Sequence, residues 1–549
     1  MPSTKRNNMI SLRRFILSIV LVWATWFGAT SLHQYLDPNT HISEEMREDA
    51  RWIATSKHFL DRQSCKWLGL CGLAHYHSDP AWKRRLNKDT RDQKAMADDE
   101  FDANWVEWDD AYKNAPKMRP DDWYGDDRVL REVPQYVLDH APLVHLYSGE
   151  KFWPADIKDH LQHVTPYENH TSLHMNSSQH TLHNLHLLNE GRRGRVLFMQ
   201  SKDDVEDRPR WLGSAYNKPI PYEDEIKHEE DWETVEEEEE EEEEMEFIET
   251  KEDGQEAWDD ASDENRMKIA APLESSFRAQ PQITGQGRRD LKKRRDSSGK
   301  PNQSGYSPAP ATLIIVDKGH GIVDAFWFYF YSYNLGTTVM KMRFGNHVGD
   351  WEHSLIRFHN GVPKAVFFSA HFGGLGYHYK AVEKGQGPGR EGRPVIYSAV
   401  GSHAMYATPG THPYVLPFKL LADVTDKGPI WDPVLNYRAY FYNTSLTHNV
   451  DARFATSNFP VQTIADSFQP AAQNPDAPTG WFWFNGHWGD KFYELSDWRQ
   501  WRFVGQYHYV NGPLGPKFKN LGRSRVCQSG LKCILVDSLE KGKHRSWVG

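Results

Sequence analysis

The sequence predicts a mainly β, α+β protein with a β-sandwich-like core, peripheral helices, an N-terminal membrane helix and a long disordered acidic insertion. β-branched and aromatic runs separated by Gly, Pro and Asn fill the second half of the chain, where long helical periodicity is scarce. An apolar stretch near the N-terminus is long enough to cross a bilayer. The net charge of -11 is local: residues 223–264 carry 25 acidic residues and two lysines (-23), so the remainder sums to -11 + 23 = +12.

Residues 1–36 are expected to form a cytosolic tip followed by a signal anchor. Residues 15–32 contain no charged side chain, and a helix of this length spans about 27 Å, close to the ~30 Å hydrocarbon core. Basic residues precede the stretch and acidic residues follow it, which predicts a cytosolic N-terminus and a lumenal C-terminal region. We therefore expect a single-pass endomembrane protein of the secretory pathway or vacuole. The alternatives are a cleaved signal peptide, which gives a secreted protein, and a buried soluble helix.

The four cysteines fit an oxidising lumen. They form two pairs, Cys65 with Cys71 and Cys527 with Cys533 in sequence order, and neither pair has the CxxC spacing of a zinc or redox site. We expect two disulfides, for which three connectivities are possible; four free thiols are the alternative. Sequons compatible with glycosylation begin at Asn169, Asn176, Asn302 and Asn443.

Composition divides the rest of the chain. We expect a charged helical or stalk region at 37–132, a β-rich domain in two parts at 133–213 and 311–530, and a tail at 531–549. Residues 214–310, acidic and then basic, lack apolar periodicity, and their like charges repel, which predicts a disordered insertion between the two parts.

The densest group of candidate ligands lies in the run GNHVGDWEH. His347, Asp350 and Glu352 have the spacing H-x-x-D-x-E, and on a strand Asp350 and Glu352 point to one face. An imidazole with two carboxylates suits Mg²⁺, Mn²⁺ or Ca²⁺. The same carboxylates can act as an acid–base pair without metal, and a polar strand end with no ligand is the simplest alternative.

Further ligand-binding candidates adjoin glycines at strand ends. No G-x-S-x-G elbow or P-loop occurs, so a serine hydrolase and a nucleotide-binding loop are not predicted. The β-rich part lacks basic patches with interleaved aromatics, and we expect no nucleic-acid partner. The candidates are His371, His403, His412 and Asp490.

A series of motifs in order along 133–213 and 311–530 resembles the vacuolar protein sorting-associated protein 62 family of fungi. The matching runs include VPQYVLDHAPLVHLYSGEKFWPADI, SKDDVEDRPRWLG, NHVGDWEHSLIRFHNGVPKAVFFSAHFGG and RPVIYSAVGSHAMYATPGTH. The resemblance implies a role in protein targeting to the vacuole, with trafficking proteins as possible partners.

The DWE run, the upstream Tyr-Ser-Tyr strand and the downstream Ser-Ala-His also resemble the necrosis- and ethylene-inducing peptide family of secreted β-sandwich cytolysins. That family's signature G-H-R-H-D-W-E supplies ligands to a divalent metal used in recognising a glycosylated sphingolipid headgroup. By position the resemblance implies metal ligation by His347, Asp350 and Glu352. Gly349 stands where the signature has its second histidine, and Asn334 and Asp324 are the candidates for a further upstream ligand.

Together these features predict a non-enzymatic lumenal membrane protein that binds a glycan or lipid headgroup through a divalent metal (Mg, Ca or Mn) and serves vacuolar traffic. The alternative is a metal-dependent hydrolase of phosphoester or glycosidic bonds in the same lumen, with Asp350 or Glu352 as general base.

Overall fold

A computed structural model describes much of both predicted parts of the β-rich domain. Within the described ranges no helix is long and apolar enough to cross a membrane, and the expected span at 15–32 lies outside them. The acidic run and the sequons at Asn169 and Asn176 also lie outside. The chain is mainly β with short helices, which confirms the predicted class. The described ranges are 44–76, 130–168, 171–173, 180–189, 197–213, 299–339, 342–415, 421–446, 466–503, 505–528 and 533–543.

The chain divides into two compact units, Met1–Ala74 with Glu494–Trp498, and His75–Tyr493 with Arg499–Gly549. The described part of the first unit contains helices α2 (Glu44–Ala54) and α3 (Phe59–Leu68) and the short strand β1 (Leu70–Cys71). Of the three connectivities that the sequence left open, the structure has Cys65 paired with Cys71 in a disulfide. Helix α3 ends before Gly69, whose φ is +65°.

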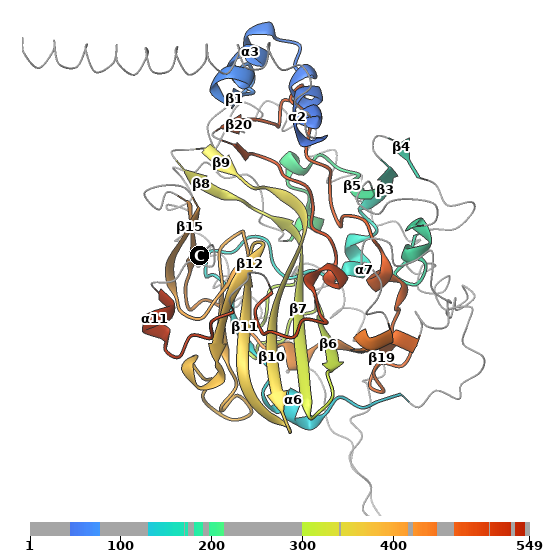
Figure 1. The fold of residues 1–549 in the computed structure, drawn as a ribbon, viewed down its shortest axis with the longest axis vertical. Helices are drawn as coiled ribbons and strands as arrows, with labels where there is room; N and C mark the ends of the chain where they lie inside the picture. Colours follow the sequence, from blue (N-terminus) through green and yellow to red (C-terminus); the bar gives the residue numbers. More distant parts are fainter. Residues whose placement is uncertain are drawn as a thin grey trace, which may run out of the picture. The chain divides into compact units, whose positions relative to one another are not determined.

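The second unit is built on a seven-stranded sheet in the order β12-β11-β10-β7-β6-β18-β19 (Figure 1). Neighbouring strands are antiparallel except β6 and β18, which are parallel. The strands are β6 (Ala311–Asp317), β7 (Ile322–Asn334), β10 (His347–His359), β11 (Val362–Ala370), β12 (Gly373–His378), β18 (Tyr437–Tyr442) and β19 (Phe468–Pro470).

Both faces of this sheet are buried, so the residues of its central strands β7 and β10 are buried on both sides rather than alternating between core and solvent. One face packs on a four-stranded sheet of β14 (Met405–Tyr406), β13 (Val395–Ser398), β2 (Leu143–His145) and β17 (Ile430–Trp431). The other face carries a tryptophan cluster in which the Trp351 ring lies 5.9 Å from Trp481 and 5.6 Å from Trp488.

Short elements complete the unit. The helices are α6 (Gln135–Asp139), α7 (Ile157–His160) and α11 (Leu539–Lys543), and a second disulfide joins Cys527 to Cys533. The remaining strands are β3 (Val164–Glu168), β4 (Thr171–Ser172), β5 (Leu197–Ser201), β8 (Thr337–Val339), β9 (Met342–Phe344), β15 (Gly410–Val415), β16 (Leu421–Thr425), β20 (Arg502–Phe503) and β21 (Gln506–Tyr507). The 3-10 turns are η3 (Leu185–Asn189), η5 (Val205–Asp207), η6 (Arg210–Leu212), η7 (Tyr379–Ala381), η9 (Pro433–Leu435), η10 (Thr444–Leu446), η11 (Gly480–Trp483) and η12 (Pro516–Lys519).

Residues on both sides of the 214–298 segment belong to the second compact unit. Strand β2 from the first part pairs in parallel with β13 from the second. The residues on either side of the 214–298 segment, Gly213 and Gly299, lie at one place in this unit. A Cβ on Gly213 would lie 2.7 Å from Phe152 Cα, and a Cβ on Gly299 would lie 1.8 Å from Pro154 O. Both ends of that segment therefore pack on residues 152–154, so closely that only glycine fits.

Candidate functional site

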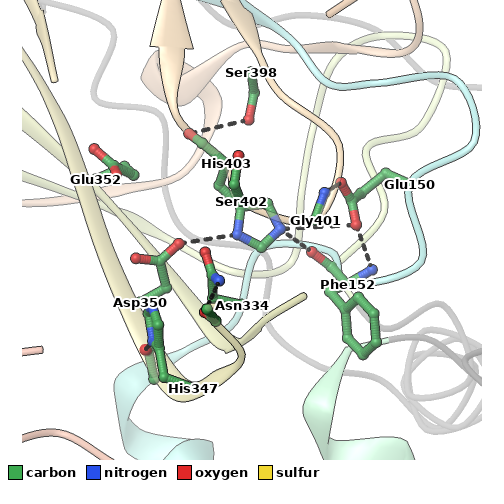
Figure 2. Close-up of polar contacts among 12 residues, drawn as sticks. Glu150, Phe152, Asn334, His347, Asp350, Glu352, Ser398, Gly401, Ser402 and His403 are labelled. Atoms are coloured by element: carbon green, nitrogen blue, oxygen red, sulfur yellow. Dashed lines mark hydrogen bonds and ion pairs between the residues drawn. The ribbon is translucent and has the colours of Figure 1, made fainter. Parts of the chain in front are cut away.

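Strand β10 carries the predicted H-x-x-D-x-E group, and an irregularity at Gly349 places its members on one face of the strand. Val348 and Trp351 belong to the same core, although residues three apart on a regular strand face opposite sides. Gly349, between them, has no partner in the pairing with β7, and its φ is +69°. His347 therefore returns to the face that carries Asp350, as Figure 2 shows.

Asp350 is held by a buried histidine. His403, fully buried between β13 and β14, has its Nδ1 3.0 Å from Asp350 Oδ2 and its Nε2 3.0 Å from the carbonyl oxygen of Phe152 (Figure 2). Both partners are acceptors, so both ring nitrogens donate and the ring is an imidazolium. Burial would lower the pKa of His403, but the charge of Glu150 and hydrogen bonds with Asp350 and Glu150 raise it to about 9.

Glu150 is the second carboxylate of this arrangement. Its Oε1 lies 3.7 Å from His403 Nε2 and accepts the backbone N–H of Phe152 at 2.8 Å, while Oε2 accepts the N–H of Gly401 at 2.8 Å. Burial would raise the pKa of Glu150, but the His403 cation outweighs it, so the pKa is lowered. A carboxylate, an imidazolium and a carboxylate thus form a continuous buried chain that ends at Asp350.

Glu352, two residues further along β10, is a different kind of carboxyl. It is 3% exposed, and Ser369 on β11 donates its hydroxyl to Oε2. Burial, and then the charge of Asp350, raise the pKa of Glu352 to about 7. It therefore changes charge near neutrality.

A second histidine–carboxylate pair adjoins this face. His371, at the end of β11, donates from Nε2 to Asp423 Oδ2 at 2.7 Å, and Ser402 and Tyr406 each donate a hydroxyl to Asp423 at 2.7 Å. Burial would lower the pKa of His371, but the charge and hydrogen bond of Asp423, together with the charges of Glu352 and Asp350, outweigh burial and raise the pKa. The His371 side chain is 25% exposed and His347 is half-buried, so both histidines are partly accessible to solvent.

His403 and His371 share an unusual backbone conformation. Their φ values are +54° and +55°, in the left-handed region that non-glycine residues seldom adopt. Such conformations cost of order 1–3 kcal/mol and persist where surrounding structure imposes them. Both histidines here are the residues that orient a buried carboxylate.

Three atoms of the predicted ligand group take no part in the hydrogen bonds described above. His347 Nδ1 donates to Gly349 O at 2.7 Å, which leaves Nε2 with a lone pair. Within the described chain, Asp350 Oδ1 and Glu352 Oε1 accept no hydrogen bond. One nitrogen and two carboxylate oxygens suit Mg²⁺, Mn²⁺ or Ca²⁺. However, no group of three or more His, Cys, Asp or Glu side chains in the described ranges is arranged to hold an ion. The metal site stays a prediction.

The remaining predicted residues divide by position. Asn334 pairs with His347 and donates from Nδ2 to Gly345 O at 2.9 Å, so it lies at the edge of the site. His412 stacks on Tyr406 at 3.8 Å, beside the Asp423 group.

Asp324 and Asp490 are not part of this group. Asp324 lies toward the opposite end of β7, where Arg357 binds it with two hydrogen bonds of 2.7 Å, because the antiparallel register pairs these two residues. Asp490 accepts from the backbone and hydroxyl of Ser201 and from Tyr493. Both carboxyls serve internal contacts.

Sequence reasoning missed Glu150 and Asp423. Glu150 lies in the first part of the domain, 200 residues before Asp350, and nothing in its surroundings SGEKF marks it. Asp423 carries a detectable signal: in β16 the buried residues Leu421, Asp423 and Thr425 alternate with less buried ones, so the period of two places a carboxyl inside.

Comparison with known proteins identifies close relatives. A family model described as vacuolar protein sorting-associated protein 62 matches residues 322–415, which include β7, β10 and β11. The chain is similar to vacuolar protein sorting-associated protein 62 of Saccharomyces cerevisiae, with 32% identity over 464 residues, 79% of this chain and 78% of the relative. It is also similar to the putative vacuolar protein sorting-associated protein TDA6 of the same yeast, with 32% identity over 75% of this chain and 73% of the relative.

Solved structures overlap a smaller part. A structure described as "Toxin fold for microbial attack and plant defense" matches with a TM-score of 0.15 and 16% identity, over 24% of this chain and 56% of that chain. Another, "NLPPya in complex with glucosamine", has a TM-score of 0.14 and 14% identity, over 23% and 55%.

Proposed function

The chain belongs to the vacuolar protein sorting-associated protein 62 family, and from this premise we propose that it serves protein traffic to the vacuole as a lumenal binding protein. Its ligand would be rich in hydroxyl groups, such as a glycan or a hydroxylated lipid headgroup. The binding site would be the acidic cluster, defined as His347, Asp350 and Glu352.

One observation carries this proposal. Each side chain of the acidic cluster keeps one acceptor atom without a partner in the described chain, while its other polar atom is fixed by a neighbour. Acceptors held in this way bind ligand hydroxyls without losing an internal hydrogen bond or much side-chain freedom.

The charge of the surroundings favours donors over anions. Four carboxyl groups, those of Glu150, Asp350, Glu352 and Asp423, face two histidines whose pKa is raised, His403 and His371. The carboxylates still outnumber these histidines when Glu352 is partly protonated, which leaves this group of residues negative. A phosphorylated ligand would be repelled, whereas a neutral sugar or one bearing an ammonium group is compatible.

A divalent cation is a second candidate for the same place. The Asp350 charge contributes to the raised pKa of Glu352, and a cation between two carboxylates relieves such repulsion. If an ion were bound, hydroxyl oxygens of the ligand could occupy its open coordination positions. Because no group of three or more His, Cys, Asp or Glu side chains in the described ranges is arranged to hold an ion, the three side chains would have to move toward one another.

The lumenal location has support of its own. The two disulfides fit an oxidising compartment, and family membership indicates the vacuolar or endomembrane system.

Binding is tested on the purified full chain by calorimetry with methyl glycosides, myo-inositol and an amino sugar, in EDTA and then with Ca²⁺, Mg²⁺ or Mn²⁺. Saturable binding that Asp350→Asn and Glu352→Gln both weaken at least tenfold, and that Asp317→Asn leaves unchanged, supports the proposal. Asp317 is an exposed carboxylate at the far end of the sheet. Binding that occurs only with an added cation would show that the site binds its ligand through a metal ion. If no sugar or polyol binds, the proposed class of ligand is refuted.

A hydrolase remains the competing function, favoured by Glu352, whose pKa is about 7, near a histidine that Asp423 orients. Turnover of nitrophenyl glycosides or phosphates that Glu352→Gln abolishes would establish it. Equal background rates in wild type and variant would exclude it for those substrates.

A further inference from the structure

We propose that Asn302 and Asn443 carry N-linked glycans, and that the β-rich domain is thereby marked as lumenal. The proposal is independent of what the acidic cluster binds. Both asparagines begin sequons, Asn302-Gln-Ser304 and Asn443-Thr-Ser445. The asparagine and the serine of each sequon are exposed in the folded protein.

The two sequons have the same local geometry. Asn302 Oδ1 accepts the N–H of Ser304 at 3.1 Å and its hydroxyl at 2.7 Å. Asn443 Oδ1 accepts the N–H of Ser445 at 3.1 Å and its hydroxyl at 2.6 Å. In both cases the amide oxygen makes the internal contacts of a turn, and the amide nitrogen is turned away from them.

The amide nitrogen is the atom that takes the sugar, and in this respect the two asparagines differ from others in the fold. Neither Asn302 Nδ2 nor Asn443 Nδ2 donates a hydrogen bond within the described residues. By contrast, Asn189 Nδ2 donates to Trp483 O and Asn436 Nδ2 donates to Ser307 O. A glycan on either sequon therefore breaks no hydrogen bond of the native fold.

The reaction needs only a donor that the lumen supplies, a lipid-linked oligosaccharide diphosphate. Nδ2 loses a proton and bonds to the anomeric carbon of the first sugar. The bond from that carbon to the diphosphate oxygen breaks, and the lipid diphosphate leaves with the bonding electrons. No oxidant or reductant is involved. Because the transfer takes place on the lumenal side of the membrane, the modification reports topology.

The position of Asn443 keeps a glycan away from the acidic cluster. Asn443 follows β18, whose Phe441 pairs with Ile315. The neighbouring Val316 pairs with Asp324, and Asp324 pairs with Arg357 near the end of β10. His347 and Asp350 lie at the start of β10, so the sugar and the acidic cluster occupy opposite ends of the sheet.

The test uses the full chain expressed in yeast and purified from membranes and medium. Release of N-glycans by peptide-N-glycosidase in heavy-oxygen water, followed by peptide mass spectrometry, is expected to leave labelled aspartate at positions 302 and 443. Asn443→Gln and Ser445→Ala should each remove one glycan-sized step of gel mobility, whereas Ser445→Thr preserves the sequon and should keep it.

The matched control is Asn520→Gln, an exposed asparagine outside any sequon, which should not change mobility. An unlabelled asparagine at either position overturns the proposal for that position. Absence of label at both positions, in protein that is folded with its disulfides formed, overturns the glycosylation proposal as a whole.

Discussion

Replacing Glu352 by Gln should stabilise the protein in alkaline solution and leave its stability nearly unchanged in acid. The amide keeps the shape of the carboxyl and can still accept the Ser369 hydroxyl, but it never ionises. Any difference between variant and wild type therefore reports the cost of charging this carboxyl beside Asp350 in the folded state.

The magnitude follows from the pKa. In the fold the pKa of Glu352 is raised from 4.5 to about 7. At ~1.36 kcal/mol per pKa unit this shift corresponds to about 3 kcal/mol as an upper bound. Because the pKa of Glu352 is higher in the folded than in the unfolded chain, the free energy of unfolding is highest with respect to this group below pH 4.5, and it falls as the pH rises through about 7. The Glu352→Gln variant should not show this fall.

Urea denaturation in EDTA at about pH 5 and about pH 8.5 measures the effect, since the wild type should lose stability relative to the variant between these values. Glu391→Gln, an exposed carboxyl on a loop, is the control and should behave like wild type at both. If Glu352→Gln is no more stable than wild type at the higher pH, the buried carboxyl does not carry the cost assigned to it.

Three further changes test the framework of the site. His403→Gln leaves two buried carboxylates without their cation, and below pH 6.5 it should lower the free energy of unfolding by about 3–5 kcal/mol, measured by urea denaturation. This loss should become smaller as the pH rises through about 9, where the wild-type histidine loses its proton. A loss that does not change with pH would contradict an imidazolium. Gly349→Ala should lower the melting temperature by several degrees, because its Cβ would lie 2.4 Å from a carbonyl oxygen at a φ of +69°. Gly345→Ala is its control: the φ is +91°, but the nearest atom to the new Cβ is 4.0 Å away, and an equal loss would refute the steric account. Cys527→Ser with Cys533→Ser should cost about 2 kcal/mol, the closure entropy of a short loop, and an unchanged denaturation midpoint would show that this disulfide does not constrain the unfolded chain.

Local patterns were sufficient to predict the mainly β class and the principal strands. The β-branched and aromatic runs in the second half of the chain include ATLIIVDK, DAFWFYFYSY, EHSLIRFH, PKAVFFSAHF and RPVIYSAVG, and they correspond to β6, β7, β10, β11 and β13, because such side chains suit buried strands. The cysteine content predicted two disulfides but left three connectivities open, and the structure selects the two short-range pairs.

The partners within the site could not be predicted in the same way. Period-two alternation places Asp350 and Glu352 on one face, but it does not show that Glu150 approaches from a segment 200 residues earlier. Equally, the sequence does not reveal that Asp324, on a neighbouring strand, is satisfied by Arg357, since that depends on the register. Both facts are set by long-range pairing.

The convergence of Gly213 and Gly299 on residues 152–154 has a consequence for how the protein can be made. Since these two points already adjoin, the 85 residues between them (299 − 213 − 1) bridge almost no distance. Chains ending at 213 and beginning at 299 would each carry half of a complementary surface, because β2 belongs to one and β13 to the other. Co-expressed, such fragments should reassemble into the native domain, which would allow each half to be labelled separately and the contact between Glu150 and His403 to be observed across two molecules.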